Sequence, residues 1–220
     1  MPNKIDYKLP QSEKQYVGNI PFGSSITLDK QSLVFGIHWN NVKDEKGIER
    51  RVDLDLHLNS KQYNIGWNGS YKDDEIIFTG DMTNAPLPNG ASEYIYLGNS
   101  IKDTLFNFKI NNYTRDVGPI PYEIIIGIAN PDDLKHNKNF VIDPNNIIMK
   151  IPMEMELGQS EQVVGVVDVS EYDIKLIFTD LTTSNLPVSR NNKADNIIRE
   201  YIKEYSKCQL SLKDILFSCG

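Results

Sequence analysis

The chain has little cysteine and no long apolar run, and these two absences argue against disulfide-rich and membrane-spanning classes of protein. Its 220 residues include only two cysteines, Cys208 and Cys219. Two cysteines cannot build a disulfide framework, and no other cysteine is present to complete a zinc site with them. No apolar segment approaches the roughly 18 residues that a membrane-spanning helix needs. We therefore expect neither a disulfide-stabilised scaffold nor a membrane span.

Basic clusters are also missing. The formal net charge is −7, and the charged residues form no long block of one sign. Proteins that bind duplex nucleic acid usually carry a basic face, so we expect no nucleic-acid partner. An acidic excess usually reflects solubility alone, although acidic groups can also gather to hold a cation. The first residues contain no apolar segment typical of a signal peptide, which makes the cytoplasm the expected compartment.

Short alternating segments predict a mainly β fold. The candidate strands are residues 26–28, 33–37, 52–58, 63–67, 75–79, 93–97, 104–111, 123–129, 147–155, 162–169 and 172–179. Turn residues separate them at regular spacing, and no helical segments are interleaved between them. This pattern predicts a two-sheet antiparallel β-sandwich and argues against a parallel α/β sheet.

The two ends of the chain depart from this pattern. Residues 1–21 are polar and are expected to form an N-terminal arm, followed by the sandwich domain at residues 22–190. Residues 191–220 are expected to form a C-terminal helical segment. Within that segment, Ser211 and Asp214 have the spacing of a capping box that opens a short last helix.

An apolar stripe marks the longer helix expected in the C-terminal segment. Its members follow the spacing of one helix face and are Ile197, Ile198, Tyr201, Ile202 and Tyr205. Two interpretations stay open, because such a stripe can dock on the sandwich or bind a partner.

The candidate strand at residues 52–58 carries two aspartates on one face. Its apolar residues alternate with Asp53, Asp55 and His57. Side chains two apart share a face, which places Asp53 and Asp55 roughly 7 Å apart. Two explanations are possible for these neighbouring charges: a solvated outer face that screens their repulsion, or a bound cation. His57 shares this face and is expected to be an ordinary surface histidine.

A turn-rich loop from Gly80 to Ser92 provides a third aspartate. Its prolines and glycines exclude a helix or a central strand. Asp81 follows Gly80, which can adopt backbone conformations that other residues avoid, and Glu93 stands at the loop exit. Calcium prefers six to eight oxygen ligands from carboxylates, amides, carbonyls and waters. The strand and the loop supply such oxygens, although without the spacing of an EF-hand.

Two motifs resemble a diverged branch of the TerD-like family. They are V-D-L-D-L at residues 52–56 and G-D-M-T-N-A-P-L-P-N-G-A-S-E-Y-I at residues 80–95. The resemblance extends from about Gly23 to Leu186 and includes G-I-H-W at residues 36–39. It implies a calcium-binding β-sandwich of the kind found in bacterial tellurite resistance, in stress response and in phage defence. Carried over by position, the implied metal ligands are Asp53, Asp55, Asp81 and Glu93.

The chain departs from the commoner family pattern at three positions. That pattern has G-D-N after the strand and G-D-D-E at the loop exit. Here Met82 replaces the asparagine, and Ala91 and Ser92 replace the aspartate pair. The replacements remove anionic ligands, which argues against a second calcium site.

The sequence features and motifs leave three functions to consider. The first is a calcium-binding sensor or scaffold that works through a protein partner of unknown identity. The alternative is a metal-independent interaction or structural protein that keeps the fold and has lost the ion site. A metal-dependent hydrolase is disfavoured, because no nucleophile or general base is identifiable beside the carboxylates. We therefore expect a protein that is not an enzyme.

Overall fold

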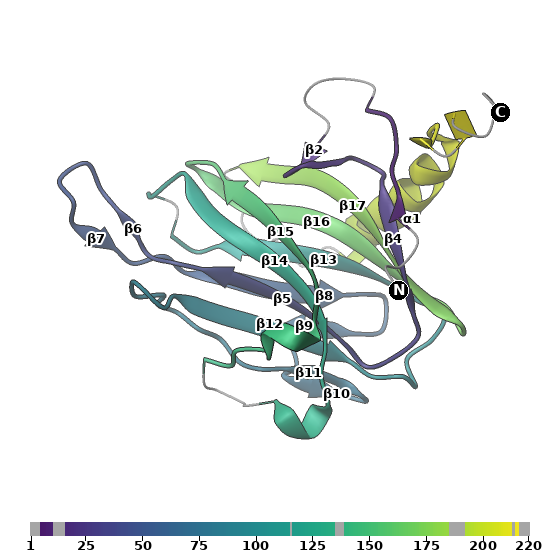
Figure 1. Cartoon of the computed structure of the whole chain (residues 1–220), viewed down its shortest axis with the longest axis horizontal. Coiled ribbons are helices and arrows are strands. Elements are labelled where there is room, and N and C mark those ends of the chain that lie inside the picture. The colour runs from purple at the N-terminus through teal and green to yellow at the C-terminus, as the bar shows by residue number, and fades with distance from the viewer. Residues whose placement is uncertain are drawn as a thin grey trace.

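The chain folds as two antiparallel sheets that face each other, with one long helix near the C-terminus (Figure 1). The computed structural model describes residues 5–10, 16–114, 116–134, 139–184, 192–212 and 214–215. The prediction of a mainly β sandwich with a C-terminal helical appendage is confirmed.

One sheet has seven strands, in the order β1-β4-β17-β16-β13-β8-β9. Their bounds are β1 Ile5–Asp6, β4 Ser25–Asp29, β17 Asp173–Ser184, β16 Gln159–Val169, β13 Thr104–Asn112, β8 Leu54–Asn59 and β9 Asn64–Gly66. β8 pairs with β13 along its whole length, whereas β9 pairs with β8 only from His57 onward. Within the described residues, the first half of β8 therefore has one edge without a strand partner.

The second sheet has six strands, in the order β10-β11-β12-β5-β14-β15. Their bounds are β10 Lys72–Asp73, β11 Ile76–Phe78, β12 Ala91–Leu97, β5 Leu33–Trp39, β14 Ile120–Ile128 and β15 Ile147–Met155. Consecutive strands β4 and β5 belong to different sheets, so the short turn between them crosses from one layer to the other.

Four short strands and two 3-10 turns complete the described elements. They are β2 Tyr16–Val17, β3 Ile20–Pro21, β6 Val42–Lys43, β7 Glu49–Arg50, and the turns Pro131–Asp133 and Pro144–Asn146. β6 and β7 form a hairpin that projects from the body of the sandwich (Figure 1).

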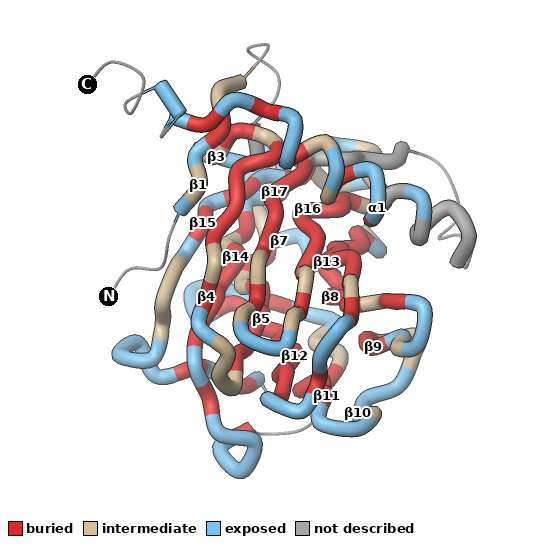
Figure 2. Tube along the Cα trace, turned by 90° about the vertical axis from the view of Figure 1, so that its right-hand side faces the viewer, coloured by how far each residue is buried: buried red, intermediate tan, exposed pale blue. Residues whose placement is uncertain are grey.

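The core lies between the two sheets, where the apolar faces of their strands meet. Buried residues run along most strands of both sheets (Figure 2). Leu54, Leu56 and Leu58 of β8 are fully buried there, as their alternation predicts. Burial of a side chain of this size contributes about 1.5–3 kcal/mol. Trp39 is also buried, and its indole Nε1 donates to the Val52 carbonyl at 3.1 Å. Trp39 thus packs in the core directly beside the start of β8.

Helix α1, Asn192–Cys208, lies on the outer face of the seven-stranded sheet. Ile202 is fully buried there in a cluster with Val166 of β16 and Ile177 of β17. In contrast, Ile197 is 72% exposed and Tyr201 is 58% exposed. Only part of the predicted stripe therefore docks on the sandwich. The side chain of Ile198 lies outside the described part of the chain.

The capping box predicted after this helix is present. The Ser211 backbone N–H donates to the Asp214 carboxylate at 2.9 Å, and the Asp214 N–H donates to the Ser211 hydroxyl at 3.2 Å. Among helices in the described ranges, none has the length and apolarity needed to cross a bilayer.

Part of the predicted N-terminal arm belongs to the sheet. β1 pairs with β4, and the next residues pair with the segment after α1. The Leu9 N–H donates to the Leu210 carbonyl at 3.0 Å, and the Leu212 N–H donates to the Tyr7 carbonyl at 2.8 Å. The two ends of the described chain are thus held together by backbone hydrogen bonds, which the polar composition of residues 1–21 does not reveal.

Candidate metal centre

The acidic face of β8 is buried. Asp53 and Asp55 point away from the leucine core, as alternation requires, yet they are only 5% and 4% exposed. The interpretation of a solvated, charge-screening outer face is therefore wrong. His57, on the same face, is 5% exposed and packs edge-on against Trp67, so the expectation of a surface histidine is also wrong.

Gly80 begins the loop that carries the third aspartate. Its φ of +123° lies in a region that residues with a side chain rarely adopt, and it lets the chain turn directly after β11. Asp81 follows and lies at the uncovered edge of β8. One oxygen from each of Asp53, Asp55 and Asp81 lies within 4.8 Å of the other two. The structure therefore brings together three of the four ligands that the resemblance implies.

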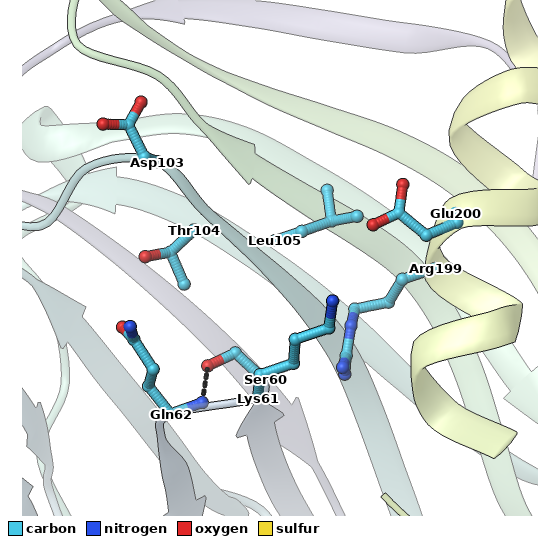
Figure 3. A pocket seen from close by; sticks show the side chains of 8 residues that line it. All are labelled: Ser60, Lys61, Gln62, Asp103, Thr104, Leu105, Arg199 and Glu200. Carbon is cyan, nitrogen blue, oxygen red and sulfur yellow. Dashed lines mark hydrogen bonds between the residues drawn. The ribbon is translucent and has the colours of Figure 1, made fainter. Parts of the chain in front are cut away.

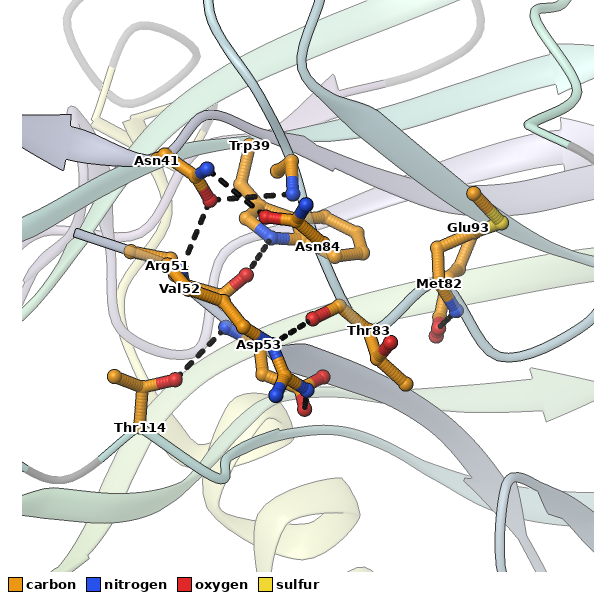
Figure 4. Close-up of polar contacts among 11 residues, drawn as sticks. Trp39, Asn41, Arg51, Val52, Asp53, Met82, Thr83, Asn84, Glu93 and Thr114 are labelled. Carbon is orange, nitrogen blue, oxygen red and sulfur yellow. Dashed lines mark hydrogen bonds and ion pairs between the residues drawn. The ribbon is translucent and has the colours of Figure 1, made fainter. Parts of the chain in front are cut away.

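Glu93, the fourth implied ligand, is engaged elsewhere. Its side chain is fully buried on the inner face of β12 and bridges two backbone groups. Oε2 accepts from the Leu56 N–H, and Oε1 accepts from the Met82 N–H, both at 2.8 Å. Figure 4 shows the contact with Met82. Glu93 thus joins the open edge of β8 to the loop of Asp81, and it lies outside the group of converging carboxylates.

Asn41 fixes the same loop from the other side. Its Oδ1 accepts from the N–H groups of Val52 at 2.9 Å and Ala85 at 3.2 Å, and its Nδ2 donates to Asn84 at 2.9 Å (Figure 4). One buried amide therefore ties the start of β8 to the loop. No local sequence signal marks this residue, since its partners lie 8 to 44 positions away.

Arg51 partly neutralises the acidic group. Its Nη2 lies 2.6 Å from Asp53 Oδ2, and its Nε donates to the Thr83 carbonyl (Figure 4). The Arg51 side chain is itself 56% exposed, whereas that of Asp53 is 7% exposed. The guanidinium therefore covers the group from the solvent side and satisfies only one of the two Asp53 oxygens.

Burial and mutual repulsion disfavour the charged forms of these carboxyls. Burial, with the nearby Asp53 and Asp81 charges adding to it, raises the pKa of Asp55 to about 8. Burial likewise raises the pKa of Asp53, against the opposing effect of Arg51, and raises that of Asp81. The pKa of Glu93 also lies well above its ordinary value, chiefly because of burial. An added positive charge would relieve this electrostatic cost.

Two oxygens of the group have no hydrogen-bond donor in the described structure. They are Asp53 Oδ1 and Asp81 Oδ1, both inaccessible to solvent. Buried polar atoms nearly always have a partner, and a bound ion can take the place of a hydrogen-bond donor. The converging ligand atoms are all oxygen, which suits calcium or magnesium and not a soft metal. The chemistry of the group therefore fits a metal ion.

A separate pocket lies between the β8–β9 turn, the start of β13 and helix α1 (Figure 3). Its volume is about 160 Å³. Lys61 and Arg199 line it together with Asp103 and Glu200, so the charges of its wall balance. The Arg199 guanidinium donates to the Asn59 carbonyl at 3.1 Å, which links the helix to the sheet. The acidic group is thus the stronger candidate for a functional site.

Comparison with known proteins assigns no function to this site. No protein-family model matches the chain, and no curated protein matches its sequence. Among solved structures, the crystal structure of an unknown function protein, SAV2460, aligns with a TM-score of 0.49 and 11% identity. The alignment covers 71% of this chain and 92% of that chain. A similarity of this degree carries no argument about function.

Proposed function

We propose that this protein is a calcium-binding β-sandwich module of TerD-like type, without enzymatic activity, that acts in the cytoplasm as a sensor or scaffold. The observation that carries the proposal is the convergence of Asp53, Asp55 and Asp81 within 4.8 Å, with two buried oxygens lacking a donor. Calcium prefers such oxygen ligands, and its charge would offset the effect of burial, which raises the pKa values of these carboxyls. A role in stress response or defence, through a protein partner, rests on the motif resemblance alone.

Thermal unfolding with and without calcium tests the proposal. An ion that binds only the folded state stabilises it by about 2.7 kcal/mol at 100 times its dissociation constant. For a chain of this size, that gain raises the melting temperature by about 5–10 °C. We expect such a rise when millimolar calcium replaces chelator. The rise should shrink strongly in Asp81→Asn and persist in Asp132→Asn, a matched change at an exposed aspartate.

The alternative function is a metal-independent interaction module, and one observation favours it. Arg51 already supplies a positive charge 2.6 Å from Asp53, which lets part of the acidic group persist without an ion. Under this alternative, the native protein melts at the same temperature in calcium and in chelator. That result would overturn the calcium-binding proposal.

A further inference from the structure

Asn111 lies beside the acidic group on the neighbouring strand. In the pairing of β13 with β8, Asn111 is directly opposite Asp55. Residues that pair directly across an antiparallel ladder project their side chains from the same face, with their Cβ atoms about 4.5–5.5 Å apart. The Asn111 side chain therefore stands next to the Asp55 carboxylate on the acidic face of the sheet.

The amide oxygen of Asn111 is buried and has no donor. The residue is 4% exposed, and its Oδ1 has no hydrogen-bond partner in the described structure. Leaving such a buried acceptor unsatisfied is destabilising, so a partner is expected. The ionised Asp55 carboxylate that binds a cation has no proton to donate, so it cannot be that partner in the ion-bound site. A cation between Asn111 and Asp55 would satisfy both oxygens.

We propose that Asn111 supplies a neutral oxygen ligand to a divalent cation held by Asp53, Asp55 and Asp81, an inference that rests on the proposed function. Together with Asp53 Oδ1 and Asp81 Oδ1, Asn111 Oδ1 makes three buried oxygens without donors. Ligands would then come from β8, β13 and the loop after β11. Amide oxygens are ordinary calcium ligands, and they add coordination without adding repulsion.

The charge of the site indicates the class of cation. Three carboxylates converge, and the Arg51 guanidinium pairs with one of them. When all three are ionised, two negative charges remain uncompensated. A divalent cation neutralises this excess, whereas a monovalent ion leaves half of it. A neutral fourth ligand keeps that balance.

Asn112 offers a matched control on the same strand. It pairs with Leu54, so its side chain points to the opposite face, toward the core. It is 2% exposed, and its Oδ1 also lacks a donor, although its Nδ2 donates to the Gln159 carbonyl at 3.2 Å. Truncation at either position removes the same buried amide, and only Asn111 faces the carboxylates.

Calorimetric titration of the protein with calcium chloride tests the assignment. We expect Asn111→Ala to weaken calcium binding by about tenfold or more, the lower end of what loss of a supporting residue costs at metal sites. Asn112→Ala should stay within about twofold of native affinity. Because truncation can prevent folding, Asn111→Asp is the second variant: it keeps an oxygen in the same place and should bind calcium at least as tightly as the native protein.

The outcomes separate the two proposals. If Asn111→Ala binds calcium like the native protein while Asp81→Asn does not, the site is real and Asn111 is not a ligand. If Asn111→Ala and Asn112→Ala weaken binding equally, the effect is general destabilisation, and the assignment fails. If the native protein itself binds no calcium, the proposed function fails and this inference fails with it.

Discussion

Asp55 is the residue at which proton binding and ion binding compete most directly. Its pKa of about 8 means that at neutral pH the carboxyl is largely protonated when no ion is bound. Calcium binds the carboxylate, so binding releases a proton. We expect calcium affinity to rise between about pH 6 and pH 8, approaching tenfold per pH unit if one proton is released. Titrations in buffers of different ionisation enthalpy measure that proton, and an affinity independent of pH would contradict the prediction.

Without calcium, the same carboxyl makes stability fall as pH rises. The folded state holds the Asp55 proton up to about pH 8, whereas the unfolded chain releases it near pH 3.8. The stabilisation that this proton gives the folded state is therefore fully present below about pH 4. It is lost as pH rises through about 8. Urea unfolding in chelator should show this decline, and saturating calcium should reduce it.

Glu93 links the strand and the loop of the acidic group through their backbone N–H groups. Replacing it with alanine leaves the N–H groups of Leu56 and Met82 without their acceptor. An unsatisfied buried donor costs about 1–3 kcal/mol, so we expect Glu93→Ala to lower the free energy of unfolding by about 2–4 kcal/mol. Glu123→Ala is the control, because its ion pair with Lys150 is half-exposed and such pairs contribute about 0–1 kcal/mol. Equal losses in urea denaturation would show that the loop finds other acceptors.

At the scale of the element, helix α1 has a buried anchor and an exposed side. Ile202 is fully buried against β16 and β17, whereas Ile197 is 72% exposed. Truncating a buried isoleucine to alanine costs about 2–5 kcal/mol, and a surface change usually costs less than about 0.5 kcal/mol. We expect Ile202→Ala to lower the free energy of unfolding by about 2–5 kcal/mol, and Ile197→Ala to lower it by less than about 0.5 kcal/mol. Denaturant unfolding measures both values. If Ile202→Ala is as stable as Ile197→Ala, the helix does not depend on this contact.

The elements themselves could largely be predicted, since their signals are local. The alternation around Asp53 and Asp55 predicts β8, and the spacing of Ser211 and Asp214 predicts the capping box. The burial of the acidic face could not be predicted, because it depends on a loop that arrives from the other sheet. Asn111 likewise has no local signal, since its position beside Asp55 follows from strand pairing across 56 positions of sequence.

At the scale of the whole molecule, sequence patterning predicts the class of fold better than its layering. Regular short strands indicate a sandwich, because each strand needs one apolar face covered. The short turn from β4 to β5 has the length of a hairpin connection, yet the two strands lie in different sheets. β4 belongs to the seven-stranded sheet because it pairs with β17, which lies some 145 residues later. Leu28 and Ile174 are one such pair. Long-range pairings of this kind leave no trace in a local pattern.

The pairing of early with late segments also bears on how the chain folds as it is synthesised. β4 is translated well before its partner β17, and Lys8 donates to the carbonyl of Gln209, 201 positions further on. At about 5–20 residues per second, a ribosome needs about 10–40 s to make that span. Throughout this interval the nascent N-terminal strands have an unpaired edge. The seven-stranded sheet can therefore close only after β17 has been synthesised.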